Sequence, residues 1–203
     1  MIIVNNIAQG TKSWFELKAG VVSSSSFSKI LTNTGKLSAQ AKDYMYQLAG
    51  ERILGECEES YTSKAMQDGI EREAGARDLF SFITNHDVEE VGFIFKDESR
   101  KIGCSPDGIF PGSGLEIKCP KLKTHVGYLL ADAMPTKYNA QVQGSMWVRG
   151  CDNWHFMSYY TGMPELITKV ARDDSYIKTL AVTINEFVEQ LDELTEKLRR
   201  GAL

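Results

Sequence analysis

Apolar and polar residues alternate in the short run Leu-Glu-Ile-Lys at residues 115–118. Because side chains of a strand point alternately to its two faces, this pattern predicts a strand whose polar face carries Glu116 and Lys118. Residues 101–110 predict the preceding strand, and the Pro-Gly-Ser-Gly sequence at residues 111–114 is typical of a turn between paired strands. The chain is therefore expected to form a β-hairpin here.

Helical spacing of apolar residues predicts helices in much of the remaining chain. A short helix is expected from Thr11 to Gly20, and the serines at residues 23–26 are expected to cap the start of another. Longer helices are predicted at residues 38–54, 62–84, 124–133, 135–150 and 183–200, and further strands at residues 88–95, 154–160 and 166–170. This mixture predicts an α/β fold, in which a mixed and mostly antiparallel β-sheet is flanked by helices.

The composition is typical of one folded domain over residues 1–203. Of the 203 residues, 42% are hydrophobic and 25% are charged, and neither an internal repeat nor a linker is visible. No transmembrane helix is expected, and the first residues lack the basic start and apolar core of a signal peptide. The four cysteines show no CxxC pairing, so they are expected to be reduced thiols in the cytosol.

The formal net charge of −4 argues mildly against nucleic-acid binding. It does not exclude such binding, because acidic residues at a metal site lower the total while a local basic surface persists. Lysines gather at residues 118–123, beside the predicted hairpin, and at residues 29–42, although each group is also consistent with an ordinary solvated face. The three histidines are scattered without the spacing of ligands, which argues against a zinc site.

The predicted hairpin would bring Asp107 beside Glu116 and Lys118. Two carboxylates, with the backbone carbonyl of Ile117 as a third ligand, suit Mg²⁺, which keeps several waters and binds phosphate oxygens. A metal ion there stabilises the charge that develops on a phosphate under attack, and the lysine beside it orients or deprotonates the attacking water. The alternative is an ordinary hairpin with a solvated Glu–Lys pair. The combination of Asp-Gly, turn and Glu-x-Lys favours a metal-dependent nuclease.

Three segments carry a family resemblance: Ser-Pro-Asp-Gly at residues 105–108, Leu-Glu-Ile-Lys-Cys-Pro at 115–120 and Tyr-Asn-Ala-Gln-Val-Gln-Gly-Ser-Met-Trp at 138–147. Together they resemble the phage lambda exonuclease family, the YqaJ-type viral recombinases or alkaline exonucleases of the PD-(D/E)xK nuclease superfamily. The resemblance implies a restriction-endonuclease-like fold and a Mg²⁺-dependent exonuclease, with Mn²⁺ able to substitute. Such an enzyme degrades one strand of double-stranded DNA ends from 5′ to 3′. A homotrimeric ring, a single-strand annealing partner and the cytoplasm of a bacterial host cell are also implied.

The same resemblance assigns further site residues. A Gly-x-x-x-Glu pattern matches the family's additional acidic residue, which implies that Glu73 assists a second metal ion or its water shell, with Glu71 as the alternative. Residues 17–25 match the family segment that grips a terminal 5′-phosphate, which implies contacts from Lys18 and Ser25. The family usually has arginine where Lys18 stands. Because lysine lacks the bidentate fork, a weaker preference for phosphorylated ends is expected.

Two glutamines on the helix at residues 135–150 compete for one role. Gln141 and Gln143 are two residues apart and do not share a face, so only one of them reaches the site. Gln143 and Trp147 are four apart and share a face, and a glutamine followed at this spacing by an aromatic residue recurs in related nucleases. Gln143 is therefore predicted to contact Lys118 or the scissile phosphate and to orient the attacking water.

Two other functions are consistent with these residues. An endonuclease of the same fold would use the same Asp, Glu and Lys set, because the site alone does not show whether a DNA end is needed. A DNA-end binding scaffold for recombination would carry the metal site incidentally, and the complete set of three residue types argues against it.

Overall fold

The computed structural model describes residues 1–57 and 64–201, without the side chains of residues 64–71. Its strands form two four-stranded sheets, each of mixed direction. The first sheet has the order β1 (Ile2–Val4), β3 (Phe93–Phe95), β4 (Ile102–Cys104) and β2 (Val22–Ser23), and the second has the order β5 (Gly108–Phe110), β6 (Ser113–Lys118), β7 (Asn153–Ser158) and β8 (Leu166–Ala171). The predicted α/β class is confirmed, with the strands divided between two sheets instead of one.

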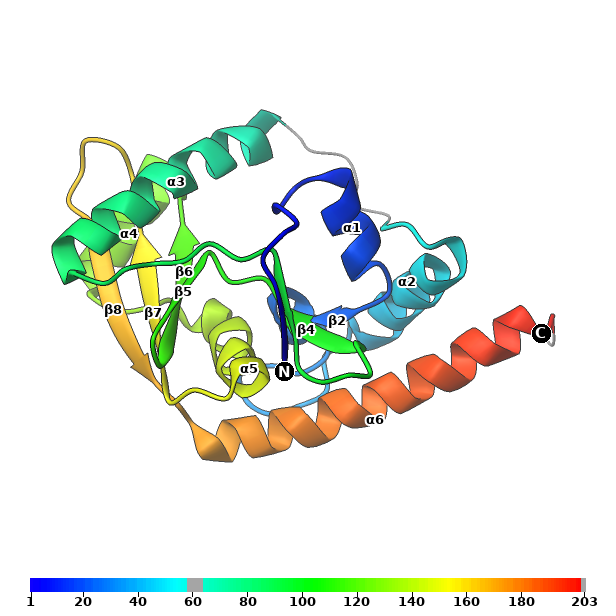
Figure 1. Cartoon of the computed structure of the whole chain (residues 1–203). Helices are drawn as coiled ribbons and strands as arrows, with labels where there is room; N and C mark the ends of the chain where they lie inside the picture. Colours follow the sequence, from blue (N-terminus) through cyan, green and yellow to red (C-terminus); the bar gives the residue numbers. More distant parts are fainter. Residues whose placement is uncertain (58–63, 202–203) are drawn as a thin grey trace.

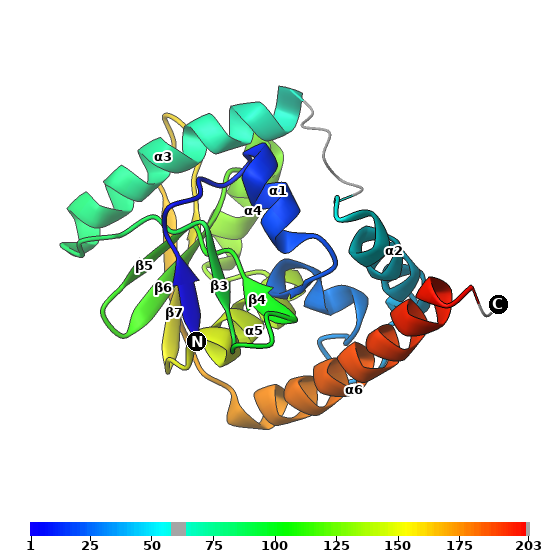
Figure 2. The same ribbon diagram turned by 45° about the vertical axis from the view of Figure 1, so that its right-hand side comes forward.

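Helices cover the sheets from several sides (Figure 1). They are α1 (Lys12–Lys18), η1 (Ser24–Lys29), α2 (Ala41–Leu54), α3 (Lys64–Thr84), α4 (Leu122–Ala131), η2 (Thr136–Tyr138), α5 (Asn139–Arg149) and α6 (Asp174–Arg199). Figure 1 and the turned view in Figure 2 place α3 on the side of β6 and α6 on the opposite side, where it packs on α2. The predicted helix at 62–84 is α3, and its first two residues lie outside the described part. Among the described helices, none is long and apolar enough to cross a membrane.

The predicted hairpin is confirmed as β5 and β6. Phe110 pairs with Ser113, so Pro111 and Gly112 alone form the turn between the two strands. Gly112 has a φ of +73°, a left-handed conformation that glycine adopts without steric cost. Tight two-residue turns of this kind fix the register of the strands they join.

The predicted strand at residues 101–110 is wrong as a single element. It divides into β4 and β5, which belong to different sheets. Pro106 lies at the break and has no backbone N–H to donate to a neighbouring strand. Its carbonyl accepts a hydrogen bond from Nε2 of Gln9, 2.9 Å away. The break places Asp107 immediately before β5, at the junction between the two sheets.

A crossover organises the second sheet. β6 and β7 pair in parallel, with Glu116 opposite Phe156, and the chain between them forms α4, η2 and α5. A parallel pair requires such a connection, because the chain must return to the same end of the sheet. This parallel pair agrees with the predicted mixed direction of the strands, and β8 extends the sheet as predicted. The crossover lays α5 against β6.

The C-terminal helix begins earlier than predicted. α6 starts at Asp174, because the side chain of Asp173 caps it by accepting a hydrogen bond from the N–H of Tyr176 at 2.9 Å. Thr183, which was expected to begin the helix, lies inside it and donates to the carbonyl of Thr179 at 3.0 Å. The extra length carries α6 from the end of β8 to α2.

Candidate active site

Strand β6 holds the Glu-x-Lys pair, with the glutamate buried and the lysine half-buried. The strand lies between β5 and β7, and α3 and α5 contact it. Glu116 is 1% exposed, and Nζ of Lys118 lies 2.5 Å from its Oε1. The two side chains share one face of the strand, as the alternation predicts. Burial of the carboxylate contradicts the alternative of a solvated surface pair.

Asp107 stands beside this pair across the hairpin. Its Oδ2 accepts a hydrogen bond from the backbone N–H of Ile117 at 2.6 Å. Its own N–H donates to the carbonyl of Leu115 at 3.1 Å. The carboxylate is thus anchored to the residue that separates Glu116 from Lys118. The predicted meeting of the two carboxylates and the lysine is confirmed.

Helix α3 adds two side chains to the site. Glu73 is half-buried and interacts electrostatically with Asp107 and Lys118, so it approaches the site as predicted. The alternative residue, Glu71, lies outside the described side chains. Nε of Arg77 donates to the backbone carbonyl of Asp107 at 2.6 Å. Sequence reasoning missed Arg77, although its spacing of four from Glu73 puts both on one helix face.

The carboxylates of the site share a buried environment. Burial raises the pKa of Glu116 to about 7, against the lowering effect of Lys118. Burial and the charge of Asp107 raise the pKa of Glu73 to about 7, and burial also raises the pKa of Asp107. Burial lowers the pKa of Lys118, but Glu116 and Asp107 raise it, and the net shift is upward. Three carboxylates thus face a lysine that balances only part of their charge.

The donor set fits a hard divalent cation. Asp107 and Glu116 offer carboxylate oxygens, the chain between Glu116 and Lys118 offers the carbonyl of Ile117, and the excess negative charge favours a cation. Among the described residues, no three His, Cys, Asp or Glu side chains form a complete metal-binding group. A hard divalent cation can be held by one or two carboxylates when water and substrate complete its coordination.

Gln141, and not Gln143, reaches the site. Nε2 of Gln141 donates to Oε1 of Glu116 at 2.6 Å. The amide of Gln143 points elsewhere, where it donates to the carbonyl of Ala171 and accepts from the N–H of Asp173, both at 2.9 Å. The prediction of Gln143 is therefore wrong. The two residues lie on different faces of α5. The four-residue spacing to Trp147 favoured Gln143, but the amide of Gln143 contacts the last residue of β8 and the chain that follows it.

Lys18 and Ser25 line one hollow between α1, η1 and α2. Ser23 and Ser26 line it as well, and the hydroxyl oxygens of Ser23 and Ser25 lie 3.3 Å apart. The helix expected at these serines is present as the 3₁₀ helix η1, although Ser23 makes no side-chain capping hydrogen bond. The structure thus brings Lys18 and Ser25 together, as expected for residues that bind one group.

Gly20 ties this hollow to α2. Its N–H donates to Oε2 of Glu51, and its carbonyl accepts from Nε of Arg52, each at 2.9 Å. The φ of Gly20 is +68°, and a Cβ built there would lie 2.1 Å from Cγ of Arg52. Both the backbone conformation and the close approach therefore require glycine at this position.

We expect Gly20→Ala to lower the free energy of unfolding by more than about 2 kcal/mol, because it adds left-handed strain and an overlap with Arg52. Gly55→Ala is the matched control, since Gly55 has a φ of +73° but nothing within 4 Å of its built Cβ. Chemical denaturation of both variants measures the difference. An equal loss in the two would attribute the effect to φ alone and contradict the role of the close approach.

Comparisons with known proteins identify the family and the fold of the chain. Residues 13–152 match the YqaJ-like viral recombinase domain. The structure of an alkaline exonuclease from Laribacter hongkongensis matches with a TM-score of 0.84 and 30% identity, covering 95% of this chain and 98% of that one, and its complex with dAMP matches equally. A phage-related exonuclease from Haemophilus somnus 129PT shares the fold, with a TM-score of 0.69 and 20% identity over 88% of this chain and 96% of that one. ExoD, an uncharacterized protein of Escherichia coli (strain K12), is 34% identical over 65 residues, which are 30% of this chain and 75% of ExoD.

The two mixed sheets flanked by helices and the structural match define an enzyme of the nuclease class with a restriction-endonuclease-like fold. The chain belongs to the YqaJ-like viral recombinase domain family, and its structure matches those of alkaline exonucleases. This membership implies an exonuclease that acts on DNA as a phosphodiesterase.

We expect substitutions of the two glutamines to have different effects. Gln141→Ala should lower the DNA cleavage rate about 10- to 100-fold, as loss of a group that orients a metal ligand does, with little change in melting temperature. Gln143→Ala should lower the free energy of unfolding by about 2 kcal/mol, because it leaves two backbone groups without their partner. Single-turnover cleavage and thermal unfolding of both variants test this. A loss of cleavage in Gln143→Ala together with a loss of stability in Gln141→Ala would contradict this assignment and support Gln143 as the site residue.

Proposed function

We propose that this protein is a Mg²⁺-dependent exonuclease that degrades one strand of linear double-stranded DNA in the 5′-to-3′ direction and leaves a 3′ single-stranded tail. The observation that carries the proposal is the meeting of Asp107 and Lys118 with the buried carboxylate of Glu116 in a chain of this family. Two carboxylates beside a lysine suit phosphodiester hydrolysis, because they offer a place for a metal ion next to a group that moves protons.

Asp107, Glu116 and the backbone carbonyl of Ile117 would hold Mg²⁺ or Mn²⁺, and Glu73 would assist a second ion or its water shell. When bound, the ion supplies Lewis-acid stabilisation of the charge that develops on the phosphate. Gln141 holds the Glu116 carboxylate in position through its 2.6 Å hydrogen bond. The role of orienting the site, predicted for Gln143, thereby passes to Gln141.

Lys118 would act on the attacking water. Beside Glu116 and Asp107 its pKa is raised, so the ammonium group is retained and orients a water by donating a hydrogen bond. A cation held by the two carboxylates would offset the charge that raises this pKa, and burial would then favour the neutral amine. After releasing its proton to solvent, the Lys118 amine would be able to accept a proton from the attacking water.

Lys18 and Ser25 would bind the terminal 5′-phosphate of the strand being degraded. Their shared hollow supports this role, since it joins a cation to several hydroxyl groups. Nζ of Lys18 lies 4.2 Å from the centre of the Trp14 ring, and this cation–π contact restricts the position of the ammonium group. A 5′-phosphate bound in this hollow would orient the strand so that its digestion proceeds from 5′ to 3′. Lysine offers a point charge in place of a fork, so the preference for phosphorylated ends is expected to be modest.

The proposal includes partners and a location. Double-stranded DNA ends are the substrate, a homotrimeric ring would enclose the duplex, and a single-strand annealing protein would receive the 3′ tail for recombination. The cytoplasm of a bacterial host cell is the expected location. These statements rest on membership of the family.

Digestion of one plasmid in linear and covalently closed forms tests the need for a DNA end. In Mg²⁺ the linear form should be degraded and the closed form left intact. Cleavage of the closed form would show an endonuclease of the same fold. Stoichiometric binding of linear DNA without release of nucleotides would show a DNA-end binding scaffold for recombination.

We expect the affinity of the protein for Mg²⁺ to fall as the pH drops below about 7. Glu116 and Glu73 have pKa values raised to about 7, so below that pH they carry protons that a metal ion must displace. Each displaced proton weakens binding about tenfold per pH unit. Calorimetric titration with Mg²⁺ at about pH 6, 7 and 8 measures this slope, and Glu73→Gln should reduce it. An affinity that is constant over this range would contradict the coupling.

A further inference from the structure

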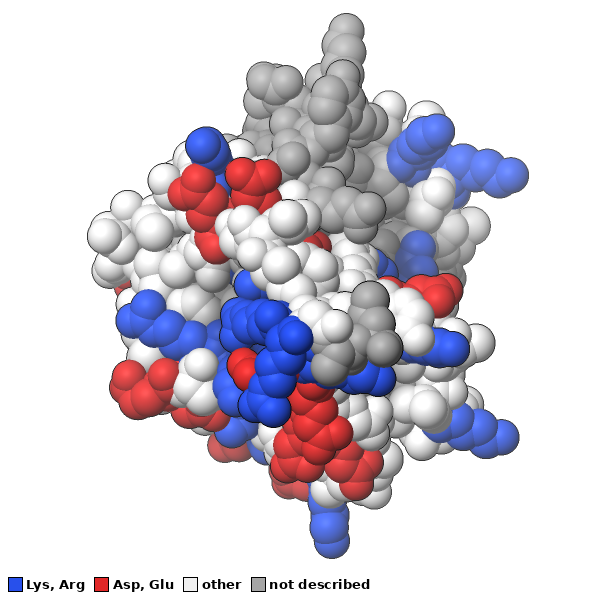
Figure 3. All heavy atoms as spheres, turned by 90° about the vertical axis from the view of Figure 1, so that its right-hand side faces the viewer, with Lys and Arg blue, Asp and Glu red and all other residues white. Residues whose placement is uncertain are grey.

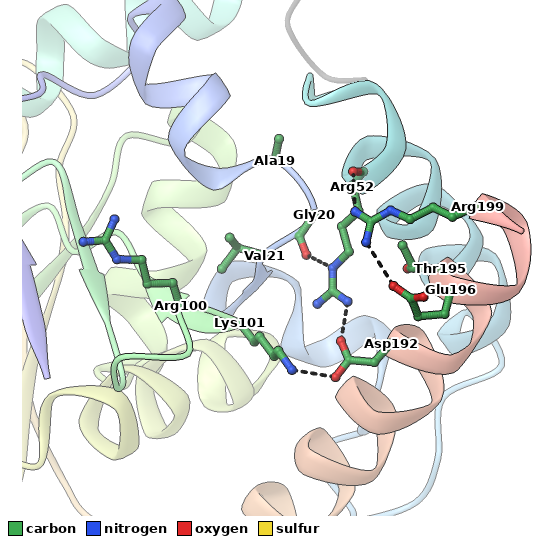
Figure 4. Close-up of a pocket in the computed structure, with 10 residues that line it drawn as sticks. All are labelled: Ala19, Gly20, Val21, Arg52, Arg100, Lys101, Asp192, Thr195, Glu196 and Arg199. Atoms are coloured by element: carbon green, nitrogen blue, oxygen red, sulfur yellow. Dashed lines mark hydrogen bonds and ion pairs between the residues drawn. The ribbon is translucent and has the colours of Figure 1, made fainter.

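A second hollow, of about 460 Å³, lies where α2 and the C-terminal half of α6 face the turn between β3 and β4 (Figure 4). Among its lining residues are four cations, Arg52, Arg100, Lys101 and Arg199, and two acids, Asp192 and Glu196. Positive charge thus prevails in this hollow, in a chain whose net charge is −4. Figure 3 shows Lys and Arg side chains gathered near the centre of the face toward which α6 ends, with acidic side chains beside them.

Asp192 shows that this hollow stabilises an anion. Its two carboxylate oxygens lie 2.6 Å from Nη1 of Arg52 and 2.8 Å from Nζ of Lys101 (Figure 4). Burial raises the pKa of Asp192, but the hydrogen bonds from Lys101 and Arg52 lower it, and the net shift is downward. Arg52 belongs to α2 and Lys101 immediately precedes β4, so the positive charge of the hollow comes from distant parts of the chain.

Two arginines lie at opposite ends of the hollow (Figure 4). Arg199 shares the carboxylate of Glu196 with Arg200, at 3.2 and 3.7 Å, so two positive charges meet one negative charge. Arg100 has a φ of +55°, which is uncommon for a residue with a side chain, and its guanidinium lies 5.5 Å from the centre of the Phe95 ring. The backbone of Arg100 is held by a hydrogen bond to Asp97 at 3.2 Å.

The hollow adjoins the one lined by Lys18 and Ser25, because Val21 lines both. A strand held by its terminal phosphate in one hollow therefore has a second group of cations nearby. Guanidinium groups bind phosphate with two parallel hydrogen bonds, which suits arginine to a backbone phosphate. We propose that the arginine-lined hollow binds a backbone phosphate of the DNA substrate. This inference rests on the proposed function, since it takes DNA as the ligand.

The salt dependence of DNA binding tests this site. Binding of a labelled linear duplex is measured by fluorescence anisotropy in EDTA, at several salt concentrations. Arg199→Ala and Arg100→Ala should each weaken binding about three- to tenfold and reduce the slope of log K against log salt by about 1, because one phosphate contact is lost. Glu196→Gln should tighten binding about two- to fivefold, because it removes the competing carboxylate.

Matched controls come from the same helix. Lys197 and Glu193 are exposed on α6 and do not line the hollow. Lys197→Ala and Glu193→Gln change the same charges and should leave the affinity and slope within about twofold of wild type. Melting temperatures confirm that each variant is folded.

The outcomes separate this inference from the proposed function. If wild type binds and digests linear DNA while Arg199→Ala and Arg100→Ala bind with an unchanged slope, the hollow serves another anion and this inference fails alone. Equal effects of the control variants would also overturn it, because the charge would then act without a site. If wild type does not bind DNA at all, the proposed function and this inference fail together.

Discussion

Lys118→Ala is expected to abolish DNA digestion. Lys118 is the cation that contacts Glu116, and its proton transfer to or from water is expected to contribute about 10²- to 10⁴-fold to the rate. Without it no other group in the proposed mechanism orients the attacking water. The protein should remain folded, because Gln141 still donates to the Glu116 carboxylate at 2.6 Å. Initial rates of nucleotide release from linear duplex in Mg²⁺ measure the loss.

Two further variants, one a control and one expected to be inactive, are compared with Lys118→Ala. Lys123→Ala removes an exposed lysine on α4, close in sequence to the site, and should digest DNA at the wild-type rate. Asp107→Ala should abolish digestion as Lys118→Ala does, because it removes a proposed metal ligand, and it should also cost about 1–3 kcal/mol of stability by leaving the N–H of Ile117 unpaired. Near-normal activity of purified Lys118→Ala would remove the lysine from the mechanism.

The second large effect concerns the metal ion. We expect Mg²⁺ or Mn²⁺ to support cleavage and Ca²⁺ to support DNA binding without cleavage. Ca²⁺ shares the charge and the oxygen preference of Mg²⁺, so the carboxylates of Asp107 and Glu116 should hold it. It is larger and accepts irregular coordination, whereas the attacking water must lie in line with the scissile bond and near Lys118. A displacement of about 1 Å is enough to lower a rate by about 10².

DNA-binding and digestion assays run in parallel with each cation measure this difference. Lys123→Ala should respond to the cations as wild type does. Full cleavage in EDTA would refute the metal mechanism. Equal rates in Ca²⁺ and Mg²⁺ would leave the metal ion in the mechanism and contradict the geometric role of Lys118.

The hairpin was predictable because its signals are local. The turn at Pro111 and Gly112 and the alternation after it fix which residues share a face. Asp107, Glu116 and Lys118 meet through two neighbouring strands, so short-range pattern is enough to bring them together. Glu73 was assigned from the family resemblance, because nothing in its own helical segment distinguishes it from an exposed glutamate.

Other features depend on contacts between distant segments. The division of residues 101–110 between two sheets follows from pairings of β4 with β2 and β3, which local alternation does not encode. The choice between Gln141 and Gln143 depends on how α5 is rotated against β6, and that rotation is set by the parallel crossover. The hollow around Asp192 joins residues more than 90 positions apart and leaves no motif in the sequence.

The polarity of digestion tests the central claim most directly. Linear duplex is labelled separately at each 5′ end and each 3′ end and is digested in Mg²⁺. The proposed enzyme should release the 5′ label first and leave the 3′ labels in long single strands. Early release of the 3′ label, or cleavage at internal sites with all four labels retained in duplex fragments, would contradict it.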